Sequence, residues 1–300
     1  MVSWDLINII TKLAALIAMA IVVGGGFVYF LMRKLEIEID QQQVIYLRWG
    51  ARAGLLFSPL YFLIQVAAVN QSGPVGMLDL EIARILLASG VGIYTVFNVC
   101  GFALVLFALT GLCTNKQQHK DSGGIRKTLA IVSYVLGAML ISGSSRFLGH
   151  TAELDLLGQV AAFAHVTVAF IWIGSLYPLL QANNDGDRFK VQRLMKDFGD
   201  WAVLLLAVLV MSGLYLSTVL MNNLGDLFGT AYGSAFILKV VLVASLLLLA
   251  ASNKFQIVPK LENPGSVQAL RQTISIEIAL AGFVLAVTAY FTSLAIGAHG

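Results

Sequence analysis

The chain has 300 residues, of which 58% are hydrophobic and 12% charged, and its formal net charge is +3. Water-soluble domains carry about 25% charged residues, so the composition excludes a soluble globular protein. The lysines and arginines are spread over several loops, which excludes the clustered basic surface of a nucleic-acid-binding protein. The two cysteines, Cys100 and Cys113, fall in or beside one apolar run and predict no disulfide framework.

In chain order, about eight apolar runs are long enough to cross a hydrocarbon core of roughly 30 Å. They cover residues 5–32, 47–69, 91–113, 127–147, 156–181, 199–221, 235–253 and 274–296. We therefore predict an all-α polytopic membrane protein, a bundle of transmembrane helices that forms a single transmembrane domain over residues 1–300. The mixed polar and apolar segment 77–87 predicts a short interfacial helix between the second and third spans.

The loops predict the orientation of the bundle. Every second loop is rich in lysine and arginine, as in Lys116–Lys127 and Arg188–Lys196, whereas the intervening loops are poor in both. The positive-inside rule places the basic loops in the cytoplasm and both termini outside. Small residues within the first span, Gly24-Gly25-Gly26, predict close packing between helices.

Two histidines stand out against this apolar background. His165 lies within the fifth span, about 13 Å below its external end at a rise of 1.5 Å per residue, and His150 lies in the short external loop before it. An ionisable residue inside a membrane span indicates function, and imidazole is the commonest metal ligand among side chains. The pair predicts a bound metal or metal cofactor, in one site or at two successive stations. His119 and His299 lie in a basic loop and at the C-terminus, positions typical of solvated histidines.

Each histidine also has an explanation that involves no metal: His165 could form a hydrogen bond between helices, and His150 could be a solvated loop residue. Among the charged residues, Glu277 is either an interfacial carboxylate or a cation station, and we expect Lys12 and Lys239 to extend towards the membrane surface. Met139 and Met211 offer thioethers, which suit Cu(I), although packing explains isolated methionines equally well. No phosphate-binding loop, zinc-protease motif or nucleophile elbow is present, so we do not expect an enzyme.

Several segments together resemble the copper resistance protein D (CopD) family of bacterial inner-membrane proteins. The resemblance extends from about residue 140 to the C-terminus. It is carried by Gly149-His150, by His165 followed by Trp172-Ile-Gly-Ser-Leu-Tyr-Pro178-Leu, by Ser212-Gly213, by Tyr232-Gly233 with Lys239, and by Asn253, Pro259 and Glu277.

The resemblance implies a multi-pass protein of the bacterial inner membrane that transports copper from the periplasm, with both termini periplasmic. It implies copper as the bound ion and a periplasmic CopC-like copper-binding protein as a partner. The implied metal ligands are His150 at the external face and His165 at mid-membrane. Trp172, Glu277, Met139 and Met211 are the supporting residues, with Trp172 packing the route and Glu277 giving an oxygen ligand near its exit.

One position departs from the family pattern. Other members carry a histidine in the first span, where this chain reads Ile10-Thr11-Lys12-Leu13. Two alternatives therefore stay open. The first is a haem b electron-transfer protein with His150 and His165 as axial ligands, and the second is an assembly factor that delivers copper to a membrane oxidase.

Overall fold

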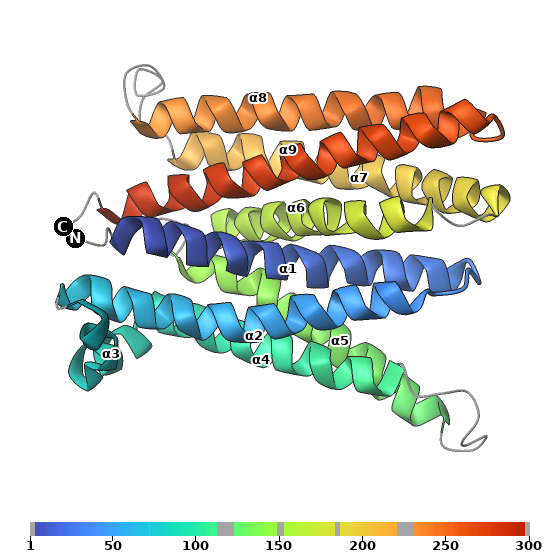
Figure 1. Cartoon of the computed structure of the whole chain (residues 1–300). Helices are drawn as coiled ribbons and strands as arrows, with labels where there is room; N and C mark the ends of the chain where they lie inside the picture. The colour runs from blue at the N-terminus through green and yellow to red at the C-terminus, as the bar shows by residue number, and fades with distance from the viewer. Residues whose placement is uncertain are drawn as a thin grey trace.

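The structure is a computed structural model that describes residues 4–71, 73–112, 123–148, 153–183, 187–220 and 231–297. Within these ranges, 8 helices are long and apolar enough to span a membrane, which confirms the predicted all-α bundle (Figure 1). They are α1 (Trp4–Lys34), α2 (Gln41–Asn70), α4 (Gly90–Leu112), α5 (Gly123–Ser144), α6 (Leu156–Ala182), α7 (Arg188–Leu220), α8 (Ala231–Ser252) and α9 (Pro264–Gly297).

The helices extend beyond the apolar runs at the end predicted to be cytoplasmic. Helix α7 begins at Arg188 and α9 at Pro264, well before the apolar runs that start at residues 199 and 274. A helix satisfies its own backbone hydrogen bonds in water as well as in lipid, so hydropathy marks the membrane-embedded part and not the helix end.

The predicted interfacial segment is also helical. A 3₁₀ turn, Gly73–Leu78, leads into helix α3, Leu80–Leu87. Asp79 caps α3, since its carboxylate accepts hydrogen bonds from the backbone N–H groups of Glu81 and Ile82 at 3.0 and 3.1 Å. Leu80 and Ile85 remain more than two-thirds exposed, as expected of a helix that lies along a membrane surface.

Three consecutive glycines in α1 each face a different helix. A Cβ on Gly24 would lie 2.6 Å from the Cα of Gly174 in α6, and one on Gly25 would lie 2.8 Å from Leu47 in α2. A Cβ on Gly26 would overlap the phenol of Tyr134 in α5, whose hydroxyl donates to the Val22 carbonyl at 2.7 Å. The packing role predicted for this segment is confirmed.

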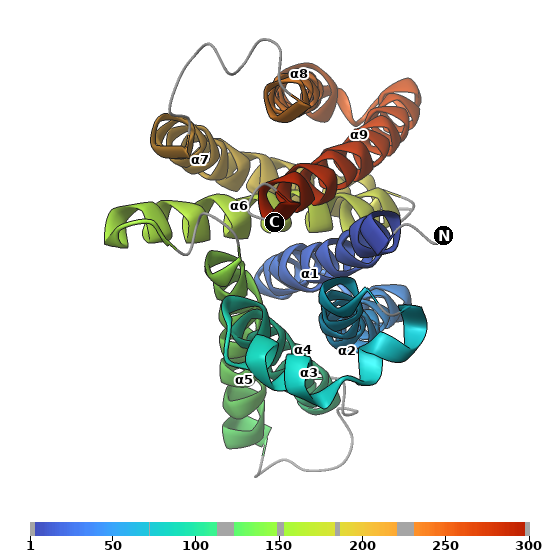
Figure 2. The same ribbon diagram turned by 90° about the vertical axis from the view of Figure 1, so that its left-hand side faces the viewer.

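Two hydrophobic cores share helices α1 and α6. The first core joins α1, α2, α4 and α5, with Tyr61 and Phe102 fully buried at its centre. The second joins α7, α9 and the segment after α8. We call the first four spans the N-terminal bundle and α7, α8 and α9 the C-terminal bundle, with α1 and α6 side by side in the middle (Figure 2).

The ends of helices that topology assigns to the cytoplasm meet at one end of the bundle. Gln181 of α6 donates to Gln42 of α2 at 2.9 Å, and Asn183 donates to the carbonyl of Val267 in α9 at 3.1 Å. Arg188 of α7 donates to the Glu262 carbonyl at 2.9 Å. Alternating helix directions therefore hold throughout the bundle, while the side on which the termini lie stays a prediction.

Candidate functional site

The imidazole of His165 projects from α6 onto α7. Its Nδ1 lies 3.2 Å from the carbonyl oxygen of Leu209 and 3.2 Å from the hydroxyl of Ser212. Ser212 already donates its proton to the Val208 carbonyl at 2.6 Å, so towards the ring it acts as an acceptor, as does the Leu209 carbonyl. Both partners therefore assign the ring proton to Nδ1 and leave the lone pair on Nε2.

This arrangement is the one that a metal-binding histidine uses. A histidine that binds a metal through one ring nitrogen usually donates the N–H of the other ring nitrogen to a carbonyl or carboxylate. This hydrogen bond fixes the tautomer and the orientation of the ring. Gly213 makes room for the ring, because a Cβ there would lie 3.0 Å from Cε1 of His165. A hydrogen bond between helices was the alternative explanation for His165. The bond is present, and it orients the side chain while leaving Nε2 able to bind a cation.

Two cationic side chains lie in the half of the bundle predicted to be external. Lys239 of α8 is partly buried there. Lys12 is only 4% exposed, with its ammonium 6.0 Å from the ring centroid of Tyr61. The expectation that Lys12 extends to the membrane surface is wrong, because α2 covers it.

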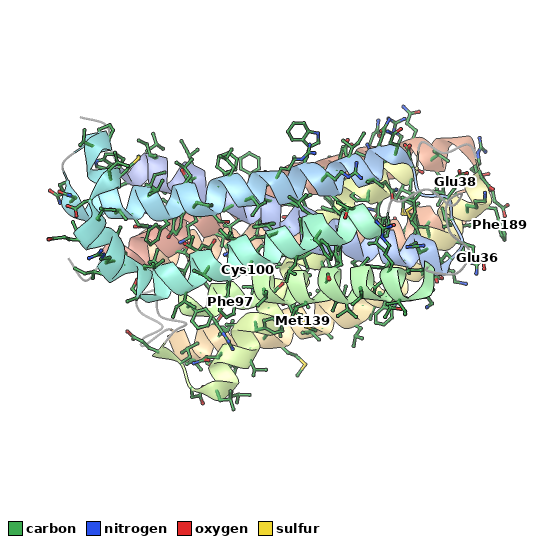
Figure 3. All side chains as sticks on the ribbon, turned by 90° about the horizontal axis from the view of Figure 1, so that it is seen from below. Glu36, Glu38, Phe97, Cys100, Met139 and Phe189 are labelled. Carbon is green, nitrogen blue, oxygen red and sulfur yellow. The ribbon has the colours of Figure 1, made fainter. Side chains whose placement is uncertain are left out.

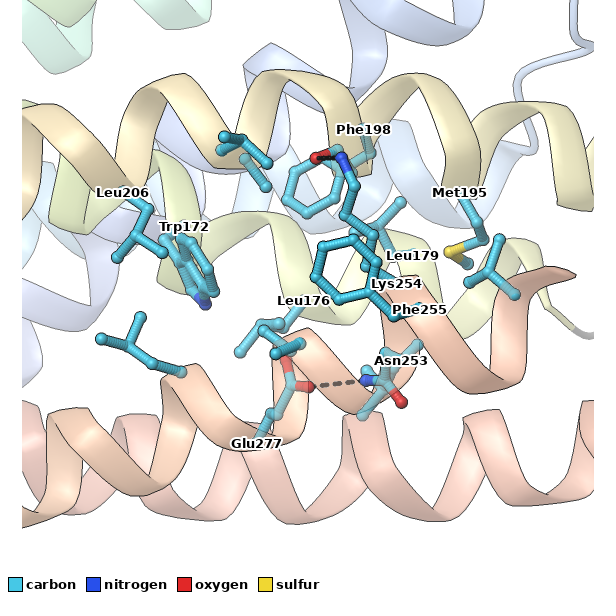
Figure 4. A pocket seen from close by; sticks show the side chains of 18 of the residues that line it. Trp172, Leu176, Leu179, Met195, Phe198, Leu206, Asn253, Lys254, Phe255 and Glu277 are labelled. Atoms are coloured by element: carbon cyan, nitrogen blue, oxygen red, sulfur yellow. Dashed lines mark hydrogen bonds between the residues drawn. The ribbon is translucent and has the colours of Figure 1, made fainter.

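A cavity of about 120 Å³ lies further along α6, among α6, α7, α8 and α9. Trp172 and Leu176 of α6 form one wall, and Met195 and Leu206 of α7 form another (Figure 4). Trp172 is two turns from His165, or roughly 10 Å along the helix. The cavity is therefore a second location, on the side of the histidine that is predicted to be cytoplasmic.

Glu277 of α9 is the buried acidic group of this cavity, with 3% exposure. Its carboxylate accepts a 2.6 Å hydrogen bond from the amide of Asn253, and the amide oxygen of Asn253 accepts one from Thr273, also at 2.6 Å. Among the described residues, Glu277 forms no ion pair. A buried carboxylate without a counter-charge is costly, so this position favours a bound cation or a proton.

Asn253 opens a π-helical turn, Asn253–Ile257, that continues α8. Such turns insert one residue into a helix and often occur at functional sites. The next residue, Lys254, points elsewhere, since its ammonium donates to the Gly199 carbonyl at 2.7 Å and to Asp200 at 3.0 Å, both in α7. This turn therefore connects the cavity to both α9 and α7.

The remaining predicted residues are scattered. Met139 and Met211 are 57% and 72% exposed, and the Met139 side chain points away from the bundle (Figure 3). His150 lies outside the described residues, as do His119 and His299. Within the described part of the chain, no group of three or more histidine, cysteine or acidic side chains could hold a metal ion.

Two residues that line or support the cavity were not singled out from the sequence. Met195 is buried at 6% exposure on the cavity wall, and Thr273 orients Asn253. The helical spacing of Val191, Leu194, Met195 and Phe198 among charged residues could have indicated a buried face that includes Met195, whereas a threonine in an apolar helix carries no such signal. The spacing of Asn253, Thr273 and Glu277 becomes informative only when α8 and α9 are known to pack together.

Two comparisons relate the chain to known copper proteins. Residues 192–291 match the family described as Copper resistance protein D, which covers Ser212, Asn253 and Glu277 but not His165. The chain is also 30% identical over 196 residues to the copper transport protein CutJ of Bacillus subtilis (strain 168). The aligned region covers 63% of this chain and 34% of CutJ, so the chain spans about a third of that relative's length.

Proposed function

We propose that this chain, which belongs to the copper resistance protein D family by its residues 192–291, transports copper across the membrane that it spans. The observation that carries the proposal is the orientation of His165. Its Nδ1 is held by Leu209 and Ser212 at 3.2 Å, so Nε2 presents a lone pair within the membrane. The similarity to a protein named as a copper transporter supports copper as the cargo.

The route that we propose consists of successive copper-binding sites. Copper arrives at His150 on the periplasmic side, passes to Nε2 of His165, and then moves along α6 past Trp172 into the cavity. There the thioether of Met195 and the carboxylate of Glu277 are the available donors. Thioether and imidazole ligands suit Cu(I), whereas carboxylate oxygen is a harder donor, so the ion is held less tightly near its exit.

The setting of this activity is part of the proposal. We expect the chain to lie in the bacterial inner membrane with both termini in the periplasm, and to receive copper from a CopC-like periplasmic protein. His150 is the residue that we expect to meet that partner, since it precedes α6 at the external end.

Copper uptake into proteoliposomes tests the proposal. His165→Ala should abolish uptake and weaken copper binding, because no other described imidazole replaces it, whereas the control Thr167→Ala should transport normally. Thr167 lies on the same helix and bonds only to the Phe163 carbonyl, at 2.7 Å. Unchanged copper uptake by the His165→Ala protein would contradict the proposal.

The same protein sample separates the alternatives. A Soret band that disappears in His165→Ala would identify haem b ligation instead. Tight copper binding with no net flux in proteoliposomes would identify a copper-delivery factor. A colourless protein that binds copper and shows flux supports transport.

A further inference from the structure

The cavity beside Glu277 opens sideways between two membrane-spanning helices. Helix α7 packs on α6, and α8 packs on α9, while the described residues of α7 and α8 make hardly any contact with each other. Val203 of α7 and Phe255 after α8 both line the cavity, and they are 52% and 70% exposed. Because α7 and α8 are both candidate membrane spans, this opening faces the hydrocarbon of the bilayer.

The lining of the cavity suits an apolar guest. Leu206, Leu247 and Ala250 form its deep wall, and the polar pair Asn253 and Glu277 lies at one side. Apolar cavities of about 150 Å³ stay dry and accept small apolar molecules. A cavity of about 120 Å³ that opens to lipid is therefore filled by hydrocarbon rather than by bulk water.

Two lysines lie near the mouth of the cavity at the end predicted to be cytoplasmic. The stem of Lys254 lies 3.6 Å from where a Cβ on Gly199 would be, and its ammonium bonds to Gly199 and Asp200. An ammonium has three donors, so one N–H of Lys254 remains for an anion. Lys196 is exposed one turn before Asp200 on α7 and adds a second positive charge at this end.

We propose that the apolar wall of this cavity, at Leu206, Leu247 and Ala250, holds one acyl chain of an anionic phospholipid, whose phosphate binds Lys254 and Lys196, and that the side with Met195 and Glu277 stays open to copper. Basic pockets between transmembrane helices on the cytoplasmic side are known to bind anionic headgroups. The Lys254–Asp200 ion pair does not oppose this binding, because Asp200 is 65% exposed and exposed ion pairs are weak. A bound chain would also exclude water from the carboxylate of Glu277.

Fluorescence of Trp172 tests the proposal directly, because this side chain lines the cavity. The full chain with Trp4→Phe, Trp49→Phe and Trp201→Phe retains Trp172 alone and is reconstituted in phosphatidylcholine vesicles. A few mole per cent of phosphatidylglycerol with brominated acyl chains is then added, and quenching is compared with that by brominated phosphatidylcholine. We expect at least twofold stronger quenching by the anionic lipid.

Matched variants test separately how the acyl chain and the headgroup contribute to lipid binding. A chain that retains only Trp4, which lies at the other end of the bundle at the start of α1, should be quenched equally by both lipids. Ala250→Phe fills the cavity from α8 and Ala202→Leu fills it from α7, and each should lower the quenching of Trp172. Lys254→Gln should remove the preference for the anionic lipid, whereas Asp200→Asn should preserve it.

Two results would overturn the proposal. The first is equal quenching of Trp172 by the two brominated lipids. The second is quenching that both cavity-filling variants leave unchanged. Both results concern the lipid alone, whereas the test of transport is His165→Ala, at a residue outside the cavity lining, so failure of this inference and failure of the proposed transport function are distinguishable.

Discussion

The N-terminal and C-terminal bundles are built from equally apolar helices but are packed very differently. Buried residues make up 44% of the apolar stretch of α1 and of α4, compared with 6% in α7 and 11% in α8. The family match, residues 192–291, falls in the loosely packed part. Hydrophobicity alone does not bring helices together in lipid, so the closer packing of the N-terminal bundle reflects small residues, such as Gly24, Gly25 and Gly26, that let helices approach.

This difference assigns a role to each bundle. The N-terminal bundle is a rigid support in which glycines and buried hydroxyl groups bring backbones together. The C-terminal bundle leaves space between α7 and α8 for the cavity that contains Glu277. Helix α6 belongs to both, with Gly174 against α1 and His165 against α7.

The largest expected effect comes from the contact between the two bundles. In Gly174→Leu, the new Cβ would overlap the Ala20 carbonyl and lie 3.0 Å from the Cα of Gly24. Because the overlap is with backbone atoms, we expect a loss of more than about 5 kcal/mol in the free energy of unfolding, above the usual cost of overpacking, measured from the thermal unfolding midpoint in detergent. The control Gly282→Ala, at a glycine with nothing within 4 Å, should be as stable as the parent, and a stable Gly174→Leu protein would contradict the close crossing.

The next largest effect is expected from a comparison of a buried phenylalanine with an exposed one. Phe102 is fully buried in the N-terminal bundle, whereas Phe283 of α9 is 63% exposed. Phe102→Ala should cost about 3–5 kcal/mol of unfolding free energy through the cavity that it creates, and Phe283→Ala should cost less than about 0.5 kcal/mol. Equal losses in chemical unfolding experiments would remove the distinction between the bundles.

A smaller effect is expected from the residue that orients His165. Ser212→Ala removes one of the two acceptors of Nδ1, and loss of such a supporting hydrogen bond typically weakens metal binding about tenfold or more. Isothermal titration with Cu(I) measures the change. Ser217→Ala is the control, because its hydroxyl bonds only to the Gly213 carbonyl at 2.7 Å; an equal loss in both variants would argue against the orienting role.

The smallest effect concerns the chain of hydrogen bonds at Glu277. Thr273→Val leaves the buried amide oxygen of Asn253 without its 2.6 Å donor, which should cost about 1 kcal/mol of unfolding free energy. Thr292→Val, whose hydroxyl bonds within α9 at 2.8 Å, should cost less. Thermal unfolding in detergent distinguishes the two, and no difference between them would show that Thr273 does not support Asn253.

The spans were predictable from the sequence because crossing a bilayer requires a long apolar run, and such runs are visible in the residues themselves. The packing of Gly24, Gly25 and Gly26 was predictable for a similar reason, since glycine in a membrane helix usually marks close approach. His165 and Glu277 were found because ionisable residues are rare inside a membrane.

The directions in which side chains point were not predictable. A helix that is apolar on all sides gives no periodic signal for its buried face, so nothing in the sequence showed that Met139 and Met211 are exposed. Met195 lies in the charged start of α7, where the spacing of apolar residues does indicate a buried face. The partner of His165 lies 44 residues away, and only the packing of α6 on α7 brings it near. The role of Thr273 depends in the same way on how α8 and α9 meet.

The π-helical turn at Asn253–Ile257 makes the cavity sensitive to the exact length of the chain. Neighbouring residues there serve different helices, with Asn253 bonded to α9 and Lys254 bonded to α7. Because a π turn contains one residue more than an α-helical turn, deleting Phe255 would restore ordinary winding and leave Val258 on the cavity wall, but Asn253 and Lys254 would lose the spacing that directs them to different helices. A natural relative that lacks one residue at this point would therefore need other side chains to link this turn to α7 and α9.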